Sequence, residues 1–557
     1  MKEKNINKNA IKRLAIIIGI LLVIAVIVMI VKNLSKEKIN NTTNLIINNR
    51  DVTSGLKYDI KIEDGIIYMS MNDIDNYFDK YIYLEEETNE IVTTYEDKIA
   101  SIGFESNRIT INGSVKKTNA RARIEGEIYY LPISEMLEVY NIELKNIENM
   151  NTITLDSLDR KQVKATLKSN VSVKSQGKFL SRIVDKAKKD SIVIVINNES
   201  SKENGWSKVR TENGKIGYVK TSELENLTTV REEEIEQKQI IGKVNMFWDY
   251  FSQWVQAPNR AGQKIEGVNV VSPSFFYLDE DNGSLNENVG NAGKTYIDWA
   301  HSNGYKVWPM ISNAEAGIKI TSNILNSYTK RQNLIQSIVE KCALYDIDGI
   351  NVDFENMYQE DQEEFSRFII ELMPRMQEMG MVVSVDVTAP DGAPNWSLCY
   401  DRNVIGDVAD YLVFMAYDQY GASDTKAGTT AGFNWIETSL KKIIEYDEVD
   451  TEKIILGIPF YTREWTVTQD GTAKSKVVNM INIKIPTNVE KQWDDILKQY
   501  YMEYKSGKNT IKMWIEDGTS IKEKVSLVTK YNLGGTSCWR KDMETSNVWS
   551  IIKEELE

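Results

Sequence analysis

The sequence predicts an α/β protein in which residues 241–557 form a (β/α)8 barrel, preceded by two small domains and an N-terminal membrane-spanning helix. Three observations lead to this prediction. From about residue 241, eight apolar strand candidates alternate with helical patterns, as in a barrel. Residues 162–228 contain short apolar runs between polar turns, which is typical of a small β-barrel. Residues 14–31 contain no charged side chain.

The N-terminal segment predicts a membrane anchor. Leu14–Val31 is a run of 18 uncharged residues, about 27 Å long as a helix, which is enough to cross a bilayer core. By the positive-inside rule, the basic residues 1–13 are cytoplasmic and the later domains lie outside the cell membrane. A cleaved signal peptide is the alternative, but the run is long and no small-x-small pattern follows Val31. We therefore expect a single-pass anchor and a polar tether over residues 32–50.

Charge and composition exclude several kinds of partner. The chain carries a net −14, of which residues 1–38 contribute +6, so the remainder carries −20. Nucleic-acid binding needs a basic surface and is not expected. One histidine, His301, and three scattered cysteines give no metal-ligand cluster, so we predict no metal and no cofactor. The oligomeric state does not follow from the sequence.

Residues 51–158 predict an α+β module with a weak internal repeat. The stretches Ile67–Ile74 and Ile128–Leu137 each read as a strand followed by a short helix. The module resembles the N-terminal domain of copper amine oxidases, a resemblance that implies no copper because no ligand cluster is present.

The next segment, residues 162–228, contains the pattern Trp206-x-Lys208-Val209 followed by Gly214-x-x-Gly217-Tyr218-Val219. This pattern resembles bacterial SH3-type domains. Trp206 and Tyr218 fit two roles, either as core aromatics or as a binding surface for a glycan or peptide. Residues 229–240 then read as a linker.

The barrel prediction rests on eight apolar segments. They are Lys243–Trp248, Val268–Tyr277, Lys306–Ile311, Gly349–Phe354, Val382–Val387, Tyr411–Ala416, Ile454–Pro459 and Gly535–Trp539. More than 70 residues separate the last two. That interval, with Trp465–Lys530, predicts an inserted α+β subdomain beside the barrel mouth.

The segment Asp348–Glu355 (Asp-Gly-Ile-Asn-Val-Asp-Phe-Glu) is the most informative for function. Its residues alternate, so Asn351, Asp353 and Glu355 share one face of a strand and the apolar residues share the other. Alternate residues lie about 6.6–7 Å apart along a strand. Carboxylates this close repel each other, which can keep one protonated as a general acid near neutral pH. This is the chemistry of a glycosidase.

Four motifs together resemble glycoside hydrolase family 18. The octapeptide is similar to the family's DGxDxDxE strand, with Asn351 in place of the middle Asp. Met415-Ala416-Tyr417-Asp418 resembles the end of the family's sixth strand. Gly457–Tyr461 resembles the seventh strand, and Gly534–Trp539 resembles the eighth.

This resemblance implies a role for each matching residue. Glu355 would be the general acid and base of a substrate-assisted retaining mechanism, in which the substrate's 2-acetamido group replaces a protein nucleophile. Asp353 would stabilise the oxazolinium and orient the acetamide nitrogen, and Tyr417 would donate to the acetamide oxygen. Residues expected to bind substrate are Asp418, Trp539, Asn351 and Arg463. Residues expected to support the site are Asp348 and Met415.

The amide at Asn351 bears on the substrate. It cannot titrate, and the form with Asn resembles the branch of the family that acts on bacterial peptidoglycan, including spore-cortex N-acetylglucosaminidases. We therefore expect peptidoglycan, or another N-acetylglucosamine-containing glycan, as the substrate. The alternatives are a chitinase and a non-catalytic glycan-binding protein of the cell wall, because a fold does not fix an activity.

Overall fold

The computed structural model describes residues 43–196, 205–232, 239–252 and 254–557. The predicted cytoplasmic tail (1–13) and membrane-spanning helix (14–31) lie outside these ranges, as does most of the tether. None of the helices within these ranges is long and apolar enough to span a bilayer. Contacts divide the chain into two compact units. Among the described residues, the first contains those up to Ile82, Ile102–Thr110 and those from Val115 to residue 232, and the second contains Tyr83–Ser101, Ile111–Ser114 and those from residue 239 to Glu557.

The first unit begins with a strand where the tether was predicted. β1 (Asn44–Ile47) pairs in parallel with β13 (Thr152–Ser157), and Leu45, Ile46 and Ile47 are buried. The predicted tether over residues 32–50 is therefore too long at its C-terminal end. The sheet has the order β12-β13-β1-β2, with β12 at Ile142–Ile147 and β2 at Arg50–Asp51.

The two similar stretches of the first unit lie side by side. β4 (Ile66–Ser70) pairs antiparallel with β11 (Ile128–Pro132) in a sheet of order β10-β11-β4-β3. β4 leads into α2 (Met71–Tyr77), whereas β11 leads into a single 3-10 turn, Ile133–Glu135. The remaining strands of this part are β3 (Lys61–Glu63), β8 (Arg108–Ile111), β9 (Ser114–Lys117) and β10 (Arg123–Glu125).

A seven-stranded sheet completes the first unit, in the order β16-β15-β19-β18-β17-β14-β20. Its strands are β14 (Gln162–Leu167), β15 (Val171–Lys174), β16 (Ile183–Ala187), β17 (Ile192–Ile196), β18 (Trp206–Arg210), β19 (Ile216–Lys220) and β20 (Leu224–Arg231). β20 continues beyond the predicted domain end at residue 228. Trp206 and Tyr218 are half-buried, and the apolar core of this sheet consists of valine, leucine and alanine side chains.

The second unit contains a complete barrel of parallel strands, and all eight predicted segments form it. β21 (Val244–Asp249) pairs with both β22 (Val270–Pro273) and β36 (Gly535–Trp539), which closes the sheet. The strands between them are β25 (Lys306–Val307) with β26 (Met310–Ser312), β27 (Gly349–Asp353), β28 (Val382–Val387), β29 (Tyr411–Met415) and β30 (Ile454–Pro459). The short hairpin β23 (Phe276–Leu278) and β24 (Leu285–Glu287) joins the sheet beside β26.

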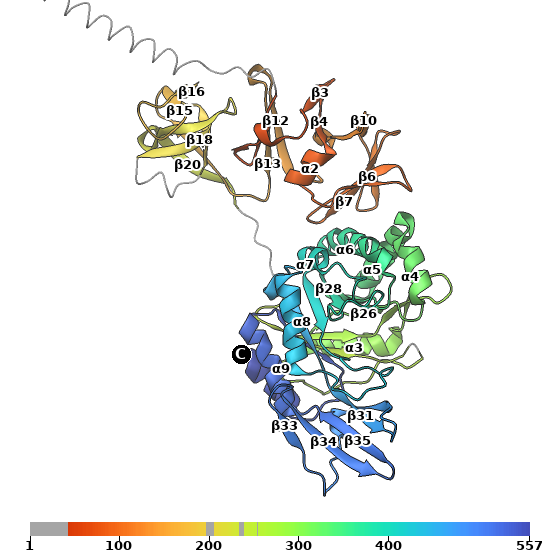
Figure 1. Cartoon of the computed structure of the whole chain (residues 1–557). Coiled ribbons are helices and arrows are strands. Elements are labelled where there is room, and N and C mark those ends of the chain that lie inside the picture. The colour runs from red at the N-terminus through yellow and green to blue at the C-terminus, as the bar shows by residue number, and fades with distance from the viewer. Residues whose placement is uncertain (1–42, 197–204, 233–238, 253) are drawn as a thin grey trace, which may run out of the picture. The chain divides into compact units, whose positions relative to one another are not determined.

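Helices surround these strands, as Figure 1 shows. They are α3 (Gly290–Ser302), α4 (Gly317–Leu325), α5 (Tyr328–Tyr345), α6 (Gln362–Gln377), α7 (Arg402–Val408), α8 (Phe433–Glu445), α9 (Gly518–Tyr531) and α10 (Val548–Leu556). Outward-facing strand residues pack against them. Phe354, from the apolar face of the octapeptide, stacks on Phe368 of α6 with ring centroids 5.7 Å apart. Trp248 and Trp308 fill the barrel interior, as expected for a packed rather than open barrel.

The predicted insertion is present between β30 and α9, but it contains no α-helix. It is an antiparallel sheet of order β32-β31-β35-β34-β33 with one 3-10 turn, Met480–Asn482. Its strands are β31 (Tyr461–Val467), β32 (Ala473–Asn479), β33 (Gln492–Asp494), β34 (Gln499–Ser506) and β35 (Asn509–Ile515). The expected α+β insertion is thus corrected to a β-sheet. The helical pattern near residue 525 belongs to α9, whose apolar side chains pack in the core of the barrel.

The second unit also includes a segment far from the barrel in sequence. Residues 83–101 form β5 (Tyr83–Glu85), β6 (Glu90–Tyr95) and the larger part of β7 (Lys98–Gly103). β5 and β6 make an antiparallel hairpin.

Candidate active site

Two of the three acidic residues of the octapeptide, Asp353 and Glu355, lie at the C-terminal end of β27, where barrel enzymes carry their functional groups. Asp353 is the last residue of the strand, and Glu355 follows it. Tyr400 holds the backbone before Glu355, and the residue after Glu355 has a left-handed backbone. Tyr400 donates from its hydroxyl to the carbonyl oxygen of Phe354 at 2.7 Å, and Asn356 adopts a left-handed conformation with φ of 52°.

Asn313 fixes the position of Glu355, and the sequence did not reveal it. Its Oδ1 accepts from the Glu355 backbone N–H at 2.9 Å, and its Nδ2 donates to the Glu355 carbonyl oxygen at 2.9 Å. The same Nδ2 donates to Thr321 Oγ1 at 3.1 Å. Asn313 follows β26, the strand next to β27, so one buried amide holds the catalytic segment at both backbone groups.

The carboxyl groups at this end of the barrel have raised pKa values. Burial, with the charge of Glu315 nearby, raises the pKa of Asp353 to about 7. Burial, then the charges of Asp353 and Asp418, raises the pKa of Glu355 well above its ordinary value. Burial also raises the pKa of Asp386 on β28. The raised pKa of Glu355 favours its protonated form, which is the state a general acid needs.

Asn351, which was expected to bind substrate, lies inside the barrel. It is completely buried. Its Nδ2 donates to Asp386 Oδ1 at 2.7 Å and to Ser384 Oγ at 3.1 Å, while Trp248 Nε1 donates to its Oδ1 at 2.7 Å. Both the oxygen and the nitrogen of the amide are hydrogen-bonded within the barrel, so Asn351 supports the site from the barrel interior.

Two groups at the mouth are buried and available for a ligand. Among the side-chain atoms of the described residues, Tyr417 Oη and Asp353 Oδ1 are buried without a hydrogen-bond partner. Tyr417 follows β29 and lies edge-on to Trp248, with ring centroids 6.4 Å apart. Burial raises the pKa of Tyr417 well above its usual value, so its hydroxyl stays a hydrogen-bond donor. Buried polar groups are normally satisfied, so these two atoms are free to bond to a ligand.

Asp418 is tied to the insertion. Tyr461 Oη donates to Asp418 Oδ1 at 2.8 Å, and Arg463 Nη2 donates to the same oxygen at 2.9 Å. Both partners come from β31, the first strand of the inserted sheet. Asp418 has a left-handed backbone with φ of 55° and remains partly exposed. The insertion thus orients a polar group at the mouth of the barrel.

Trp539, at the end of β36, belongs to an aromatic cluster. Its ring lies 5.7 Å from that of Trp248 and 5.7 Å from that of Tyr250. Trp539 is half-buried, so part of its ring remains accessible and offers an apolar surface of the kind that sugar rings contact. Met415, which was expected to support the site, is buried.

Asp348 lies at the other end of β27, as expected of a structural residue. It accepts from Lys306 Nζ at 2.7 Å and from the Val307 backbone N–H at 2.9 Å, and it bonds His301 Nε2 at 2.9 Å. Burial raises the pKa of Asp348, but these hydrogen bonds outweigh it and hold the pKa below its usual value. The lone histidine is thus a structural partner.

Four residues near the site escaped the sequence analysis: Asn313, Glu315, Asp386 and Tyr461. Asp386 carried a signal, because it and Ser384 are the polar positions in an otherwise apolar strand, Val382–Val387. Asn313 and Glu315 lie in the loop after β26, and Tyr461 is the first residue of β31. Nothing local marks them as part of a site, since Asn313 and Tyr461 bond to Glu355 and Asp418, which lie 42 and 43 residues away in the sequence.

The model of glycosyl hydrolases family 18 matches residues 246–544, and that of the copper amine oxidase N-terminal domain matches residues 46–178. Among curated proteins, the glycosylase YvbX of Bacillus subtilis is 25% identical over 299 residues, covering 52% of this chain and 84% of that protein. The cortical fragment-lytic enzyme of Bacillus subtilis is 26% identical over 244 residues, covering 42% of this chain and 55% of that enzyme.

Solved structures are also similar. The spore cortex-lytic enzyme SleL of Bacillus megaterium is 20% identical, with a TM-score of 0.47, covering 59% of this chain and 77% of that one. A chitinase from Chromobacterium violaceum is 22% identical, with a TM-score of 0.49, covering 56% of this chain and 99% of that one.

Proposed function

The chain belongs to family 18 of the glycosyl hydrolases, and we propose that within this family it hydrolyses β-1,4 linkages of N-acetylglucosamine in bacterial peptidoglycan. The observation that carries the proposal is the arrangement at the C-terminal end of β27 and β29. A carboxyl group with a strongly raised pKa, Glu355, lies with two buried groups that have no partner, Asp353 Oδ1 and Tyr417 Oη.

Each group has a part in a substrate-assisted mechanism. Protonated Glu355 donates its proton to the glycosidic oxygen as the bond from the anomeric carbon breaks. The carbonyl oxygen of the substrate's acetamido group attacks that carbon and forms an oxazolinium. Tyr417 donates to the acetamide oxygen, and Asp353 accepts from the acetamide N–H and stabilises the positive charge. Glu355, now ionised, takes a proton from the water that opens the oxazolinium.

Two features favour peptidoglycan over chitin. Asn351 stands where many chitinases carry an aspartate, a difference that resembles the wall-acting branch of the family. The curated relatives include cortical fragment-lytic enzymes of Bacillus subtilis, Bacillus cereus and Bacillus anthracis. Chitinase activity is the second candidate, because an endochitinase of Metarhizium anisopliae is 24% identical over 250 residues.

A wall substrate also fits the proposed location. We propose that Leu14–Val31 anchors the chain in the cell membrane, with the barrel on the outer side. The uncharged run and the basic residues before it support this orientation. Protease accessibility of the barrel on intact cells, before and after detergent extraction, tests the location.

The activity test compares residues 41–557 with the Glu355→Gln variant on purified peptidoglycan and on chitin. Released fragments are reduced and identified by mass spectrometry. We expect new N-acetylglucosamine reducing ends from peptidoglycan with the wild type alone. Release from chitin only would assign a chitinase. Wall binding without release by either protein would identify a non-catalytic glycan-binding protein.

A further inference from the structure

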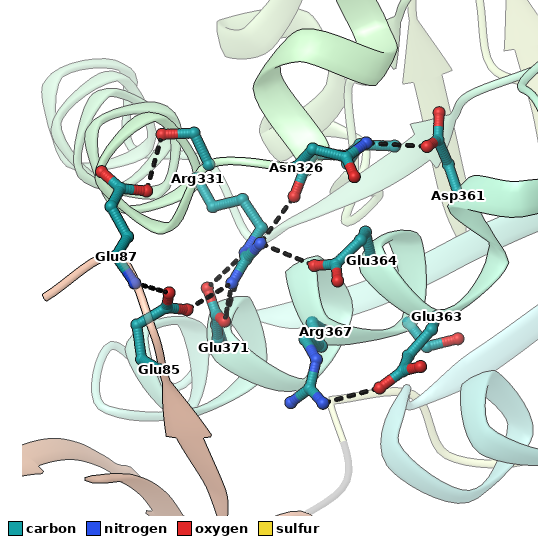
Figure 2. A network of polar contacts seen from close by, with 12 residues as sticks. Glu85, Glu87, Asn326, Arg331, Asp361, Glu363, Glu364, Arg367 and Glu371 are labelled. Atoms are coloured by element: carbon teal, nitrogen blue, oxygen red, sulfur yellow. Dashed lines mark hydrogen bonds and ion pairs between the residues drawn. The ribbon is translucent and has the colours of Figure 1, made fainter. Parts of the chain in front are cut away.

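The segment Tyr83–Ser101 packs on the two helices that flank the catalytic strand in the chain. α5 precedes β27 and α6 follows it. Polar groups of both helices converge on Arg331 of α5, whose side chain is 2% exposed, and on Glu371 of α6, which is fully buried. Figure 2 shows this cluster together with Glu85 and Glu87 of the segment.

The guanidinium of Arg331 donates to groups on α4, on α6 and on the segment. Nη1 donates to the Leu325 carbonyl oxygen at 2.6 Å and to Glu364 Oε2 at 2.8 Å. Nε and Nη2 donate to Glu371 at 2.9–3.2 Å. A guanidinium has five N–H groups. The remaining one on Nη2 lies toward the segment, 3.3 Å from Tyr83 Oη and 3.5 Å from Glu85 Oε2.

Tyr83 bridges the segment and α6. Its hydroxyl donates to Glu371 Oε1 at 2.7 Å, and the guanidinium carbon of Arg367 lies 3.9 Å from its ring centroid. Such a cation–π contact strengthens when water is excluded. Burial and the adjacent charge of Glu371 raise the pKa of Tyr83, so its hydroxyl remains a donor.

Glu87 lies at the N-terminus of α5. Ser327, the N-cap residue of this helix, donates from its hydroxyl to Glu87 Oε2 at 3.0 Å. Hydrogen bonds from Thr329, then that from Ser327, hold the pKa of Glu87 below its usual value. A carboxylate at this position complements the positive end of the helix dipole. The segment therefore contacts α5 both at its first turn and at Arg331.

We propose that residues 83–101 are an integral part of the catalytic unit. The face formed by α5 and α6 holds this segment through the cluster of Arg331, Glu371 and Glu85. The matched family region, residues 246–544, is then not autonomous. Removing the segment would expose the buried Arg331 and Glu371 and leave the last guanidinium N–H without its partners. Breaking a buried charged cluster by removing one partner is strongly destabilising, and here the helices affected adjoin the catalytic strand.

Cleavage of the full-length chain tests the proposal without assuming that either half folds alone. A protease recognition sequence placed between Glu236 and Gln237 is cut after purification, and the fragments are examined by size-exclusion chromatography over a dilution series. We expect the two fragments of the wild type to elute together. Separation of the wild-type fragments at the concentrations at which the uncut chain was purified would overturn the proposal.

A matched pair of variants tests the cluster itself. Glu85→Lys brings an ammonium group to the Arg331 guanidinium, whereas Glu86→Lys makes the same charge change at the next residue, which is exposed. We expect at least about a tenfold weaker association of the cut fragments for Glu85→Lys, and faster hydrogen exchange in α5 and α6. Glu86→Lys should match the wild type. Equal association of both variants would refute the role of this cluster.

Discussion

Replacing Asn313 with alanine tests whether the backbone of Glu355 must be held for catalysis. The variant loses the two hydrogen bonds to Glu355, each 2.9 Å, and the 3.1 Å bond to Thr321. At a net value of about 1 kcal/mol for each bond, the free energy of unfolding should fall by about 3 kcal/mol. The Glu355 N–H, left buried without a partner, adds to this cost.

The effect on activity follows from orientation. A displacement of about 1 Å at a reacting group can lower the rate by about 100-fold. We therefore expect kcat to fall by about 10- to 100-fold, which corresponds to about 1.4–2.7 kcal/mol in the activation free energy. KM should change little, because Asp418 and Trp539 remain in place. The assay measures kcat and KM against pH on a soluble glycan fragment, with chemical denaturation in parallel.

Asn326→Ala is the matched control. Its amide donates to the Ser322 carbonyl oxygen at 2.9 Å and to Asp361 Oδ1 at 2.7 Å, at the end of α4. It makes no contact with Glu355 among the bonds found in the described residues. The control should lose stability while keeping its kcat. If Asn313→Ala lost stability but kept the wild-type kcat, or if both variants lost kcat equally, the positioning role of Asn313 would be refuted.

Three further substitutions give distinct outcomes. Asn351→Asp places a second carboxyl group at the 2.7 Å contact with Asp386. The two carboxyl groups must then share a proton. Tm should therefore fall as pH rises from about 5 to 8, more steeply than in the wild type. Asp348→Asn should lower Tm at neutral pH. The pKa of Asp348 is depressed in the folded state, so its stabilisation exists above the unfolded value of about 3.9 and is lost as pH falls through the folded one. The difference in Tm should therefore shrink below about pH 4. Lys524→Met leaves Glu516 unpaired in a pair that is 0% exposed on both sides, and should cost about 3–5 kcal/mol in urea denaturation.

The sequence predicted those features that local periodicity determines. The eight barrel strands and the alternation from Asn351 to Glu355 follow from spacings of two residues, which a short window reveals. The features it missed depend on pairing between distant residues. β1 forms within the predicted tether because Leu45 and its neighbours pair with β13, about 108 residues later. Arg331 is a charged residue on the buried face of α5, and its partners Glu371 and Tyr83 lie 40 and 248 residues away in the sequence.

The same limit applies to Asn351. Its alternating position along β27 placed it correctly on the inner face of the strand. That alternation does not indicate how deep in the barrel a side chain lies. The Asn351 Nδ2 donates to Asp386 Oδ1 of the neighbouring strand at 2.7 Å. This amide group is therefore not available to Asp353. An amide at this position therefore leaves Asp353 Oδ1 without a partner. In the proposed mechanism this free oxygen accepts from the acetamide N–H, so an amide at residue 351 is compatible with that chemistry and adds no titrating group to the site.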